Sequence, residues 1–322
     1  MLEALRLRAA GRAALTFAEF MDVALYDPAE GYYRRGGPRI GYGPGTDFLT
    51  ATASAPLFGR LVVAACTRLL GALPPKDHEF VEIGAEAGEG ILRGLRHPFR
   101  SVRTLGIGDP LRLDGPSVVV SNELFDAQPF RRFRFRSGAW RELGVAVGSA
   151  HLSEAEIDSD VSLPTQLPDS APEGYVIDAP LASAALALAI AEGSWTGLFL
   201  AFDYGKSWEE IAEGTPGGTA RAYRRHSQGN DLLARPGEQD LTCHVCWDWL
   251  GDALRSCGFG EARVESQEAF FMRHAGGLIE ELASSGAGGL SRDKLSLLQL
   301  LHPANMGQRF QALWALRPPA RP

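Results

Sequence analysis

Short apolar runs alternate with amphipathic stretches through the middle of this chain. The apolar runs predict strands at residues 80–83, 104–107, 117–121 and 197–202, and the stretches between them predict helices at 88–95 and 181–192. Because helices separate the strands, we expect an α/β fold with a parallel, Rossmann-like sheet and helices on both faces. The chain between His97 and Ser117 is too short for two further strand–helix units, so this half of the sheet should be partly trimmed.

Helical spacing also marks the N-terminal part. Leu2, Leu5 and Ala9 recur at helical intervals, Thr16 can cap a helix, and residues 55–73 predict a further helix that ends at two prolines. Apolar runs at 262–264 and 309–316 can add two antiparallel strands, and residues 131–143 alternate as a hairpin. We expect an N-terminal helical and glycine-loop segment over 1–75 and a core over 76–322, with insertions at about 130–175 and 206–245.

Composition narrows the classes of function. The chain has 322 residues, 45% of them hydrophobic, and a net charge of -7, which argues against a protein that binds nucleic acid through phosphate neutralisation. No apolar run is long enough to span a bilayer, so we expect a soluble protein with no membrane association. An arginine-rich, amphipathic N-terminus leaves a mitochondrial presequence open, but an ordinary helix and a cytoplasmic location are the preferred interpretation.

The four cysteines are too few and too unevenly spaced for a disulfide framework, which indicates a reducing compartment. Cys243 and Cys246 have the spacing of metal ligands. No second pair of ligands lies near them in the sequence, so we expect two small buried thiols and no metal.

The first predicted strand runs into a turn of small residues, Glu82-Ile-Gly84-Ala-Glu86-Ala-Gly88. A buried strand, a glycine turn and a helix together present backbone N–H groups to a nucleotide-like cofactor. The usual Gly-x-Gly-x-Gly pattern of SAM (S-adenosylmethionine) enzymes has Glu86 at its middle position here. The side chain of Glu86 would crowd the cofactor and repel its carboxylate.

Three acids follow the ends of predicted strands. Glu123 and Asp126 come after the third strand, beside Asn122, and Asp203 comes after the fourth. The carboxyl ends of parallel strands face one crevice, so these acids can converge into a pocket that holds a cationic nucleophile and favours its deprotonation. Helix capping is the alternative role for any one of them.

Polar loops at 217–226 and 236–244 form a second group of candidate residues. They are dense in hydrogen-bonding side chains and lie between apolar elements, which is typical of a substrate wall and equally of an ordered surface loop. Candidate substrate-binding residues, including the tyrosine after Asp203, are Tyr204, Arg221, Tyr223, His226, Asp240 and His244.

The order of these motifs resembles the MidA family of class I SAM-dependent protein methyltransferases. In chain order they include Phe20-Met21, Leu25-Tyr-Asp-Pro28, Gly31-Tyr-Tyr33, Asp47-Phe48, Pro56-Leu-Phe-Gly59, Glu82-Ile-Gly-Ala85, Asn122-Glu123, Asp203-Tyr-Gly205, Gly218-Thr219 and Gly237-Glu-Gln-Asp240. The resemblance covers nearly the whole chain. The family includes a mitochondrial complex I assembly factor that methylates an arginine of a complex I subunit.

The resemblance implies SAM as cofactor and a protein substrate, of which a respiratory-complex subunit is one example; a homodimer is one option for the oligomeric state. It places the cofactor near Glu82, Gly84, Gly88, Asn122 and Glu123. Thr50 lies in a segment that the family shares, and Asp109 can stand in for the acid that usually bonds the ribose, so both are added as cofactor-binding candidates. The catalytic candidates are the acids at the strand ends, Glu123, Asp126 and Asp203. The chain departs from the family at Glu86 and at Ala53, where the family has an acid.

Two functions follow from these observations. The first is a SAM-dependent methyltransferase that acts on a protein arginine side chain. The alternative is an inactive relative that keeps the fold as a binding or assembly module, suggested by Glu86 and Ala53. A Rossmann dehydrogenase is disfavoured, because no Gly-x-Gly-x-x-Gly follows the first strand.

Overall fold

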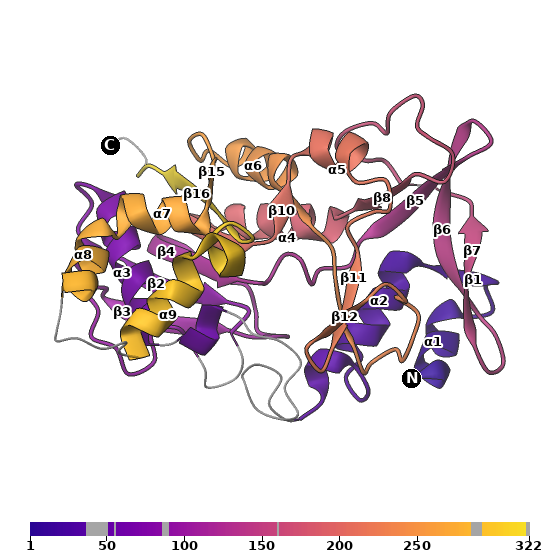
Figure 1. The fold of residues 1–322 in the computed structure, drawn as a ribbon, viewed down its shortest axis with the longest axis horizontal. Coiled ribbons are helices and arrows are strands. Elements are labelled where there is room, and N and C mark those ends of the chain that lie inside the picture. The colour runs from indigo at the N-terminus through magenta and orange to yellow at the C-terminus, as the bar shows by residue number, and fades with distance from the viewer. Residues whose placement is uncertain (37–50, 55, 86–89, 160, 285–291, 320–322) are drawn as a thin grey trace. The chain divides into compact units, whose positions relative to one another are not determined.

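A computed structural model describes residues 1–36, 51–54, 56–85, 90–159, 161–284 and 292–319 (Figure 1). The motif residues outside these ranges are Asp47, Phe48, Thr50, Glu86, Ala87 and Gly88. The chain forms two compact units from interleaved segments: residues 1–49, 125–186 and 205–250 make up unit 1, and residues 50–124, 187–204 and 251–322 make up unit 2. The expected organisation divides the chain once, at residue 75, and stays a prediction.

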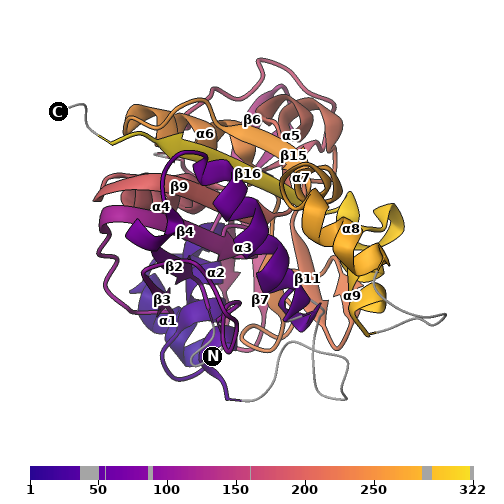
Figure 2. The same ribbon diagram turned by 90° about the vertical axis from the view of Figure 1, so that its left-hand side faces the viewer.

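Unit 2 is built on a six-stranded sheet with the order β15-β16-β9-β4-β2-β3 (Figure 2). β3, β2, β4 and β9 run parallel, whereas β16 is antiparallel to β9 and β15 is antiparallel to β16. The elements of this unit are η2 (Ala51–Ser54), α3 (Leu57–Leu70), η3 (Pro75–Asp77), β2 (Glu79–Ile83), β3 (Ser101–Leu105), β4 (Asp114–Asn122), β9 (Ser194–Asp203), β15 (Arg263–Ser266), α7 (Gln267–His274), α8 (Gly276–Ser284), α9 (Arg292–Leu301), η4 (Pro303–Gly307) and β16 (Gln311–Arg317). The Rossmann-like sheet and its antiparallel tail are as expected.

One face of this sheet is covered by α3 and the helices α7 to α9 (Figure 2). Phe58 of α3, Phe202 of β9 and Phe271 of α7 meet there, with ring centroids 5.3–6.0 Å apart. Apolar area removed from water in this way is the main term that stabilises the unit. The continuous apolar runs of β4 and β9 follow from burial within such a sheet.

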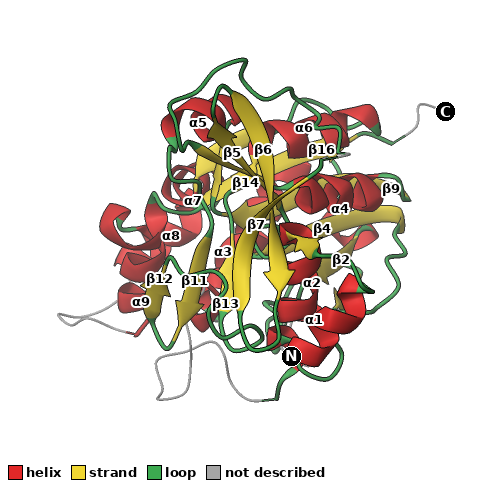
Figure 3. Cartoon of the chain, turned by 90° about the vertical axis from the view of Figure 1, so that its right-hand side faces the viewer, coloured by secondary structure: helices red, strands yellow, loops and turns green. Residues whose placement is uncertain are grey.

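Unit 1 contains a five-stranded antiparallel sheet with the order β1-β6-β5-β8, in which β7 also pairs with β6 (Figure 3). Two smaller sheets join β10 to β14 and β12 to β11 and β13. The elements are α1 (Leu2–Ala9), β1 (Ala14–Thr16), α2 (Phe17–Tyr26), η1 (Tyr32–Arg34), β5 (Arg131–Arg136), β6 (Ala139–Val147), β7 (Leu152–Ile157), β8 (Val176–Ala179), β10 (Gly205–Lys206), α5 (Trp208–Gly214), β11 (Arg221–Arg224), β12 (Ser227–Gly229), β13 (Asp240–Thr242) and β14 (Val245–Cys246). Helices α4 (Leu181–Ala191) and α6 (Trp247–Ser256) each have residues in both units.

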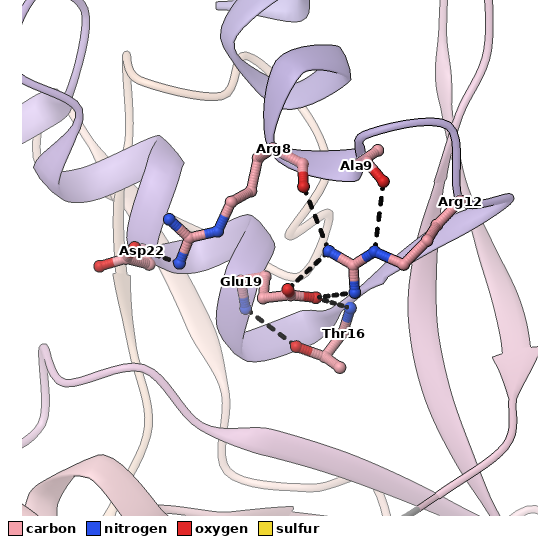
Figure 4. Close-up of polar contacts among 6 residues, drawn as sticks. All are labelled: Arg8, Ala9, Arg12, Thr16, Glu19 and Asp22. Carbon is pink, nitrogen blue, oxygen red and sulfur yellow. Dashed lines mark hydrogen bonds and ion pairs between the residues drawn. The ribbon is translucent and has the colours of Figure 1, made fainter.

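The N-terminal helices are fixed by side-chain caps (Figure 4). Thr16 and Glu19 form a capping box at the start of α2, in which each side chain accepts a hydrogen bond from the other residue's backbone N–H. Arg12 donates to the carboxylate of Glu19 and to the carbonyls of Arg8 and Ala9, which ties the end of α1 to α2. Thr16 therefore caps the helix predicted for it.

One local prediction is wrong. In the described part of the helix predicted at 88–95 no helix forms: Gly94 has a φ of 72°, and the chain continues in turns, one of them closed by the N–H of Arg93 and the carbonyl of Gly90 (2.9 Å). The predicted insertion at about 130–175 contains β7, whose carboxylates Glu154 and Glu156 pair with Arg134 and Arg136 of β5. Among the described residues, no helix is long and apolar enough to cross a membrane.

Candidate functional site

The carboxyl ends of the parallel strands bring several predicted residues of unit 2 to one edge of the sheet. Ile83 of β2 pairs with Leu105 of β3 and with Ser121 of β4, and Asn122 pairs with Phe202 of β9. Glu82, Gly84, Asn122, Glu123 and Asp203 therefore lie along the same edge, where open α/β sheets bind their ligands.

Gly84 makes the turn at the end of β2. Its backbone N–H donates to the carbonyl of Leu105 (2.8 Å), and its φ of 90° is a conformation that L side chains rarely adopt. A Cβ at this position would also lie 3.0 Å from the side chain of Leu124. Backbone geometry thus requires the first glycine of the predicted cofactor turn.

Glu82 is 5% exposed, and its carboxylate holds the far end of that turn through the backbone N–H of Ile91. Burial raises the pKa of Glu82 to about 7, against the opposing effect of the Ile91 hydrogen bond. The folded carboxyl keeps its proton to a higher pH than the unfolded one. Its contribution to stability is therefore complete below pH 4.5 and lost as the pH rises through 7.

We expect the variant Glu82→Gln, which cannot titrate, to reveal this contribution. Relative to the variant, the unfolding free energy of the wild type should fall by about 3 kcal/mol between pH 4.5 and pH 8. Denaturant titrations of both proteins across this range measure the difference. A constant difference would show that Glu82 titrates at its ordinary pKa in the folded protein.

Glu123 has strained backbone geometry. Its φ is 51°, in the left-handed region, and its N–H donates to the carbonyl of Phe202 (2.9 Å). The side-chain amide of Asn122 donates to its carboxylate (3.0 Å). A non-glycine residue in this conformation is typical of functional sites, where the surrounding structure maintains the strain.

Two buried polar atoms beside Glu123, Asn122 Oδ1 and Ser121 Oγ, have no hydrogen-bond partner among the described residues. Asp203, at the adjacent strand end, is fully buried, and its carboxylate accepts the N–H of Tyr204 (2.8 Å). Buried polar groups are normally paired, so unpaired ones at the ligand-binding edge of a sheet indicate a place for ligand groups.

The remaining predicted residues of unit 2 lie at the edge of this region. Asp109 is exposed after β3, and its carboxylate accepts the N–H of Gly106 (2.8 Å), which closes its own turn. The ring of Tyr204 packs on Phe310, with centroids 4.0 Å apart. Their predicted roles, cofactor binding for Asp109 and substrate binding for Tyr204, stay predictions.

The other acid, Asp126, belongs to unit 1 and is 5% exposed. The N–H of Cys243 donates to its backbone carbonyl (3.0 Å). Its convergence with Glu123 and Asp203 involves both units and stays a prediction.

The polar loops of unit 1 are organised by a residue that the sequence did not single out. Asp178 of β8 is fully buried and accepts hydrogen bonds from Arg132 (2.8 Å) and from the backbone N–H groups of Thr219 (2.7 Å) and Ala220 (2.8 Å). Gly218 has a φ of 71°, and a Cβ there would collide with this carboxylate. Asp178 therefore holds the turn that leads into β11.

The same turn positions two predicted substrate residues. Thr219 Oγ1 accepts the backbone N–H of His244 (3.2 Å), and Arg221 donates to the carbonyls of Gly218 and Ala220. In the paired strands, Arg221 lies opposite Thr242. Tyr223 lies opposite Asp240 in the same pair of strands, and His226 sits at the exposed hairpin turn after β11.

Burial is the largest cause that lowers the pKa of His244, and together with the charges of Lys206 and Arg221, and against the opposing charge of Glu210, it brings this pKa to about 4. The imidazole is therefore neutral near pH 7 and can take part in hydrogen bonds without carrying a charge. Its contribution to stability is present above pH 6.5 and is lost as the pH falls through 4.

The pH dependence of the unfolding free energy, measured relative to His244→Asn, should have the opposite sign from that measured relative to Glu82→Gln. Between pH 7.5 and pH 5, the unfolding free energy of the wild type should fall by about 2 kcal/mol relative to this variant. Because the two contributions have opposite signs in this window, they partly cancel in the wild type. If the unfolding free energies of His244→Asn and the wild type change in parallel at every pH, the pKa of His244 is not lowered in the folded protein.

Comparisons with known proteins add three findings. Residues 108–263 match a family described as S-adenosyl-L-methionine-dependent methyltransferases. The chain is 25% identical over 371 residues to the protein arginine methyltransferase NDUFAF7, mitochondrial, of Danio rerio, and the match covers 92% of this chain and 82% of the relative.

A solved structure from Burkholderia thailandensis bound to S-adenosylhomocysteine has the same fold, with a TM-score of 0.81, 24% identity, and coverage of 98% of this chain and 92% of that one. A second structure from the same organism superimposes with a TM-score of 0.78 and 24% identity, with the same coverage.

Proposed function

We propose that this SAM-dependent methyltransferase belongs to the MidA family and methylates an arginine side chain of a protein. The acids at the strand ends are the observation that supports a cationic acceptor. Asp203 is fully buried, and Glu123 next to it is held in a strained conformation. Carboxylates in such places bind a guanidinium well, because each oxygen accepts an N–H of the planar group.

The residues at this edge also fit the cofactor. Gly84 leaves the backbone uncovered at the end of β2, and Asn122 Oδ1 and Ser121 Oγ are buried acceptors without a partner in the described part of the chain. We propose that Gly84, Gly88, Asn122, Glu82, Thr50 and Asp109 line the cofactor site. Glu82 contributes by fixing the turn through Ile91.

When bound, SAM would supply an electrophilic methyl group on a sulfonium, and the sulfur would leave with the bonding electron pair. Glu123 and Asp203 would hold the guanidinium of the acceptor so that one of its nitrogens faces this methyl group. Glu123 would accept the proton that this nitrogen loses. Tyr204, in the same unit, is proposed to contact the acceptor, and the roles expected for Asp126 and for the polar loops of unit 1 stay predictions.

The relative from zebrafish supports arginine as the acceptor, since its name states that activity. The proposed substrate is then a protein, for example a subunit of a respiratory complex. The proposed location of this chain is the cytoplasm. A net charge of -7 suits an acceptor segment rich in positive charge.

The test combines binding and chemistry. Calorimetry with SAM and S-adenosylhomocysteine should show binding, and mass spectrometry after incubation with SAM and arginine-containing peptides should show an added methyl group on arginine. The variant Glu86→Gly should be measured beside the wild type. Methylation of another residue type in place of arginine would contradict the acceptor, and failure to bind SAM at millimolar concentration would favour the inactive-module alternative.

A further inference from the structure

Two tyrosines outside the predicted site form hydrogen bonds within unit 1, and one of them bonds a candidate substrate-binding acid, Asp240. The hydroxyl of Tyr33, in η1, donates to Asp240 Oδ1 (2.9 Å), and the hydroxyl of Tyr26, at the end of α2, donates to the carbonyl of Ala127 (2.8 Å). The two rings stack with centroids 5.5 Å apart and planes 18° apart. The N-terminal segment is thereby joined to Asp240 and to the residue after Asp126.

The acids of this arrangement are buried, with Asp126 5% and Asp240 4% exposed, whereas Tyr26 and Tyr33 are partly buried. Tyr32 packs edge-on against Tyr33, with centroids 5.2 Å apart. Aromatic rings on two sides leave the Tyr33 hydroxyl little freedom, so its hydrogen bond can fix one orientation of the Asp240 carboxylate.

Burial raises the pKa of both Tyr26 and Tyr33, and the charges of Asp240 and Asp126 raise it further. Both hydroxyls therefore keep their protons throughout the physiological range. Tyr33 acts only as a donor and cannot serve as a base.

Asp240 occupies a place that such a donor can influence. It is the first residue of β13 and lies directly opposite Tyr223 of β11, the strand that begins with Arg221. A change in the orientation of the buried Asp240 carboxylate would therefore alter the surroundings of Tyr223, a predicted substrate residue.

We propose that Tyr33 is a positioning residue for the methyl acceptor: it holds the Asp240 carboxylate in the orientation that binds the acceptor, and Tyr26 holds Tyr33. This inference rests on the proposed function, because it takes Asp240 to contact the acceptor. It adds a role for the segment Leu25-Tyr-Asp-Pro28 to Gly31-Tyr-Tyr33, whose tyrosines lie outside the predicted site.

A double-mutant cycle tests the proposal. Tyr33→Phe removes one hydroxyl and should raise the KM for an arginine peptide by about 10-fold, with the KM for SAM unchanged. Asp240→Asn should raise the same KM. In the Asp240→Asn background, Tyr33→Phe should have no further effect, because the carboxylate that it positions is gone. If the rise in KM in the double variant equals the product of the rises in the two single variants, the proposal is overturned.

Tyr175→Phe is the matched control. Its hydroxyl accepts the N–H of Thr215 (2.9 Å) in the same unit, so this variant also loses one hydrogen bond of a buried tyrosine. It should lower the unfolding free energy without changing the KM for the peptide. An equal rise in KM for Tyr33→Phe and Tyr175→Phe would show that Tyr33 has only a structural role.

The cycle separates failure of this inference from failure of the proposed function. If the wild type methylates a different protein nucleophile, arginine is excluded, and the same four proteins are compared with that acceptor. Coupling between Tyr33 and Asp240 in the KM for the true acceptor supports the positioning role. Its absence, or a wild type that transfers no methyl group, overturns it.

Discussion

Replacing Glu123 with glycine should lower kcat for methyl transfer by about 100-fold or more, while the unfolding free energy stays level or rises by up to about 1 kcal/mol. The carboxylate that is proposed to hold the acceptor and take its proton is lost. At the same time the left-handed backbone, with a φ of 51°, becomes free of strain because glycine has no Cβ. Activity and stability therefore change in opposite directions, as expected where strain is kept for function.

Glu123→Gln is the matched variant for this prediction. It keeps the side-chain size and the backbone strain and removes only the charge, so kcat should fall without any gain in stability. Single-turnover methylation assays and denaturant titrations measure both quantities, and calorimetry should show SAM binding in every protein. Wild-type kcat in Glu123→Gly would show that Glu123 does not take part in catalysis.

The largest effect on stability is expected for Asp178→Ala, which should lower the unfolding free energy by about 3–5 kcal/mol. The variant leaves the backbone N–H groups of Thr219 and Ala220 without their acceptor. It also leaves Arg132 without its carboxylate, although the Nε of that arginine already has no partner among the described residues. An uncompensated buried charge and two unpaired donors are costly in a dry interior.

Glu154→Ala provides the control from the same sheet. Glu154 also pairs with an arginine of β5, Arg134, but these side chains are 38% and 32% exposed. Water already solvates such a pair, so its loss should change the unfolding free energy by less than about 1 kcal/mol. Similar losses for both variants would contradict the role assigned to Asp178 in holding the turn at Gly218.

Local patterns were sufficient for the elements whose burial is set by their own sequence. The apolar runs of β2, β4 and β9 predict strands because both faces of such strands are covered. Thr16 and Glu19 predict the start of α2, since a capping box involves residues only three positions apart. The order of motifs likewise indicated the methyltransferase family.

Local patterns were insufficient in two places. In the described part of the helix predicted over 88–95, Gly94 has a left-handed φ of 72° and the chain forms turns in place of a helix. Within the predicted insertion at about 130–175, β7 forms a strand whose carboxylates Glu154 and Glu156 pair with arginines of β5. The spacing of hydrophobic residues signals neither outcome.

By itself, then, the sequence determined the parallel sheet, its antiparallel tail and the resemblance to a methyltransferase family, because periodic burial and motif order are properties of positions along the chain. The tertiary structure alone decided which polar residues support the candidate site. Tyr33 and Asp240 are 207 positions apart, and Asp178 and Thr219 are 41 apart. A hydrogen bond across such a separation depends on how the folded chain brings two elements together, and no local pattern encodes that placement.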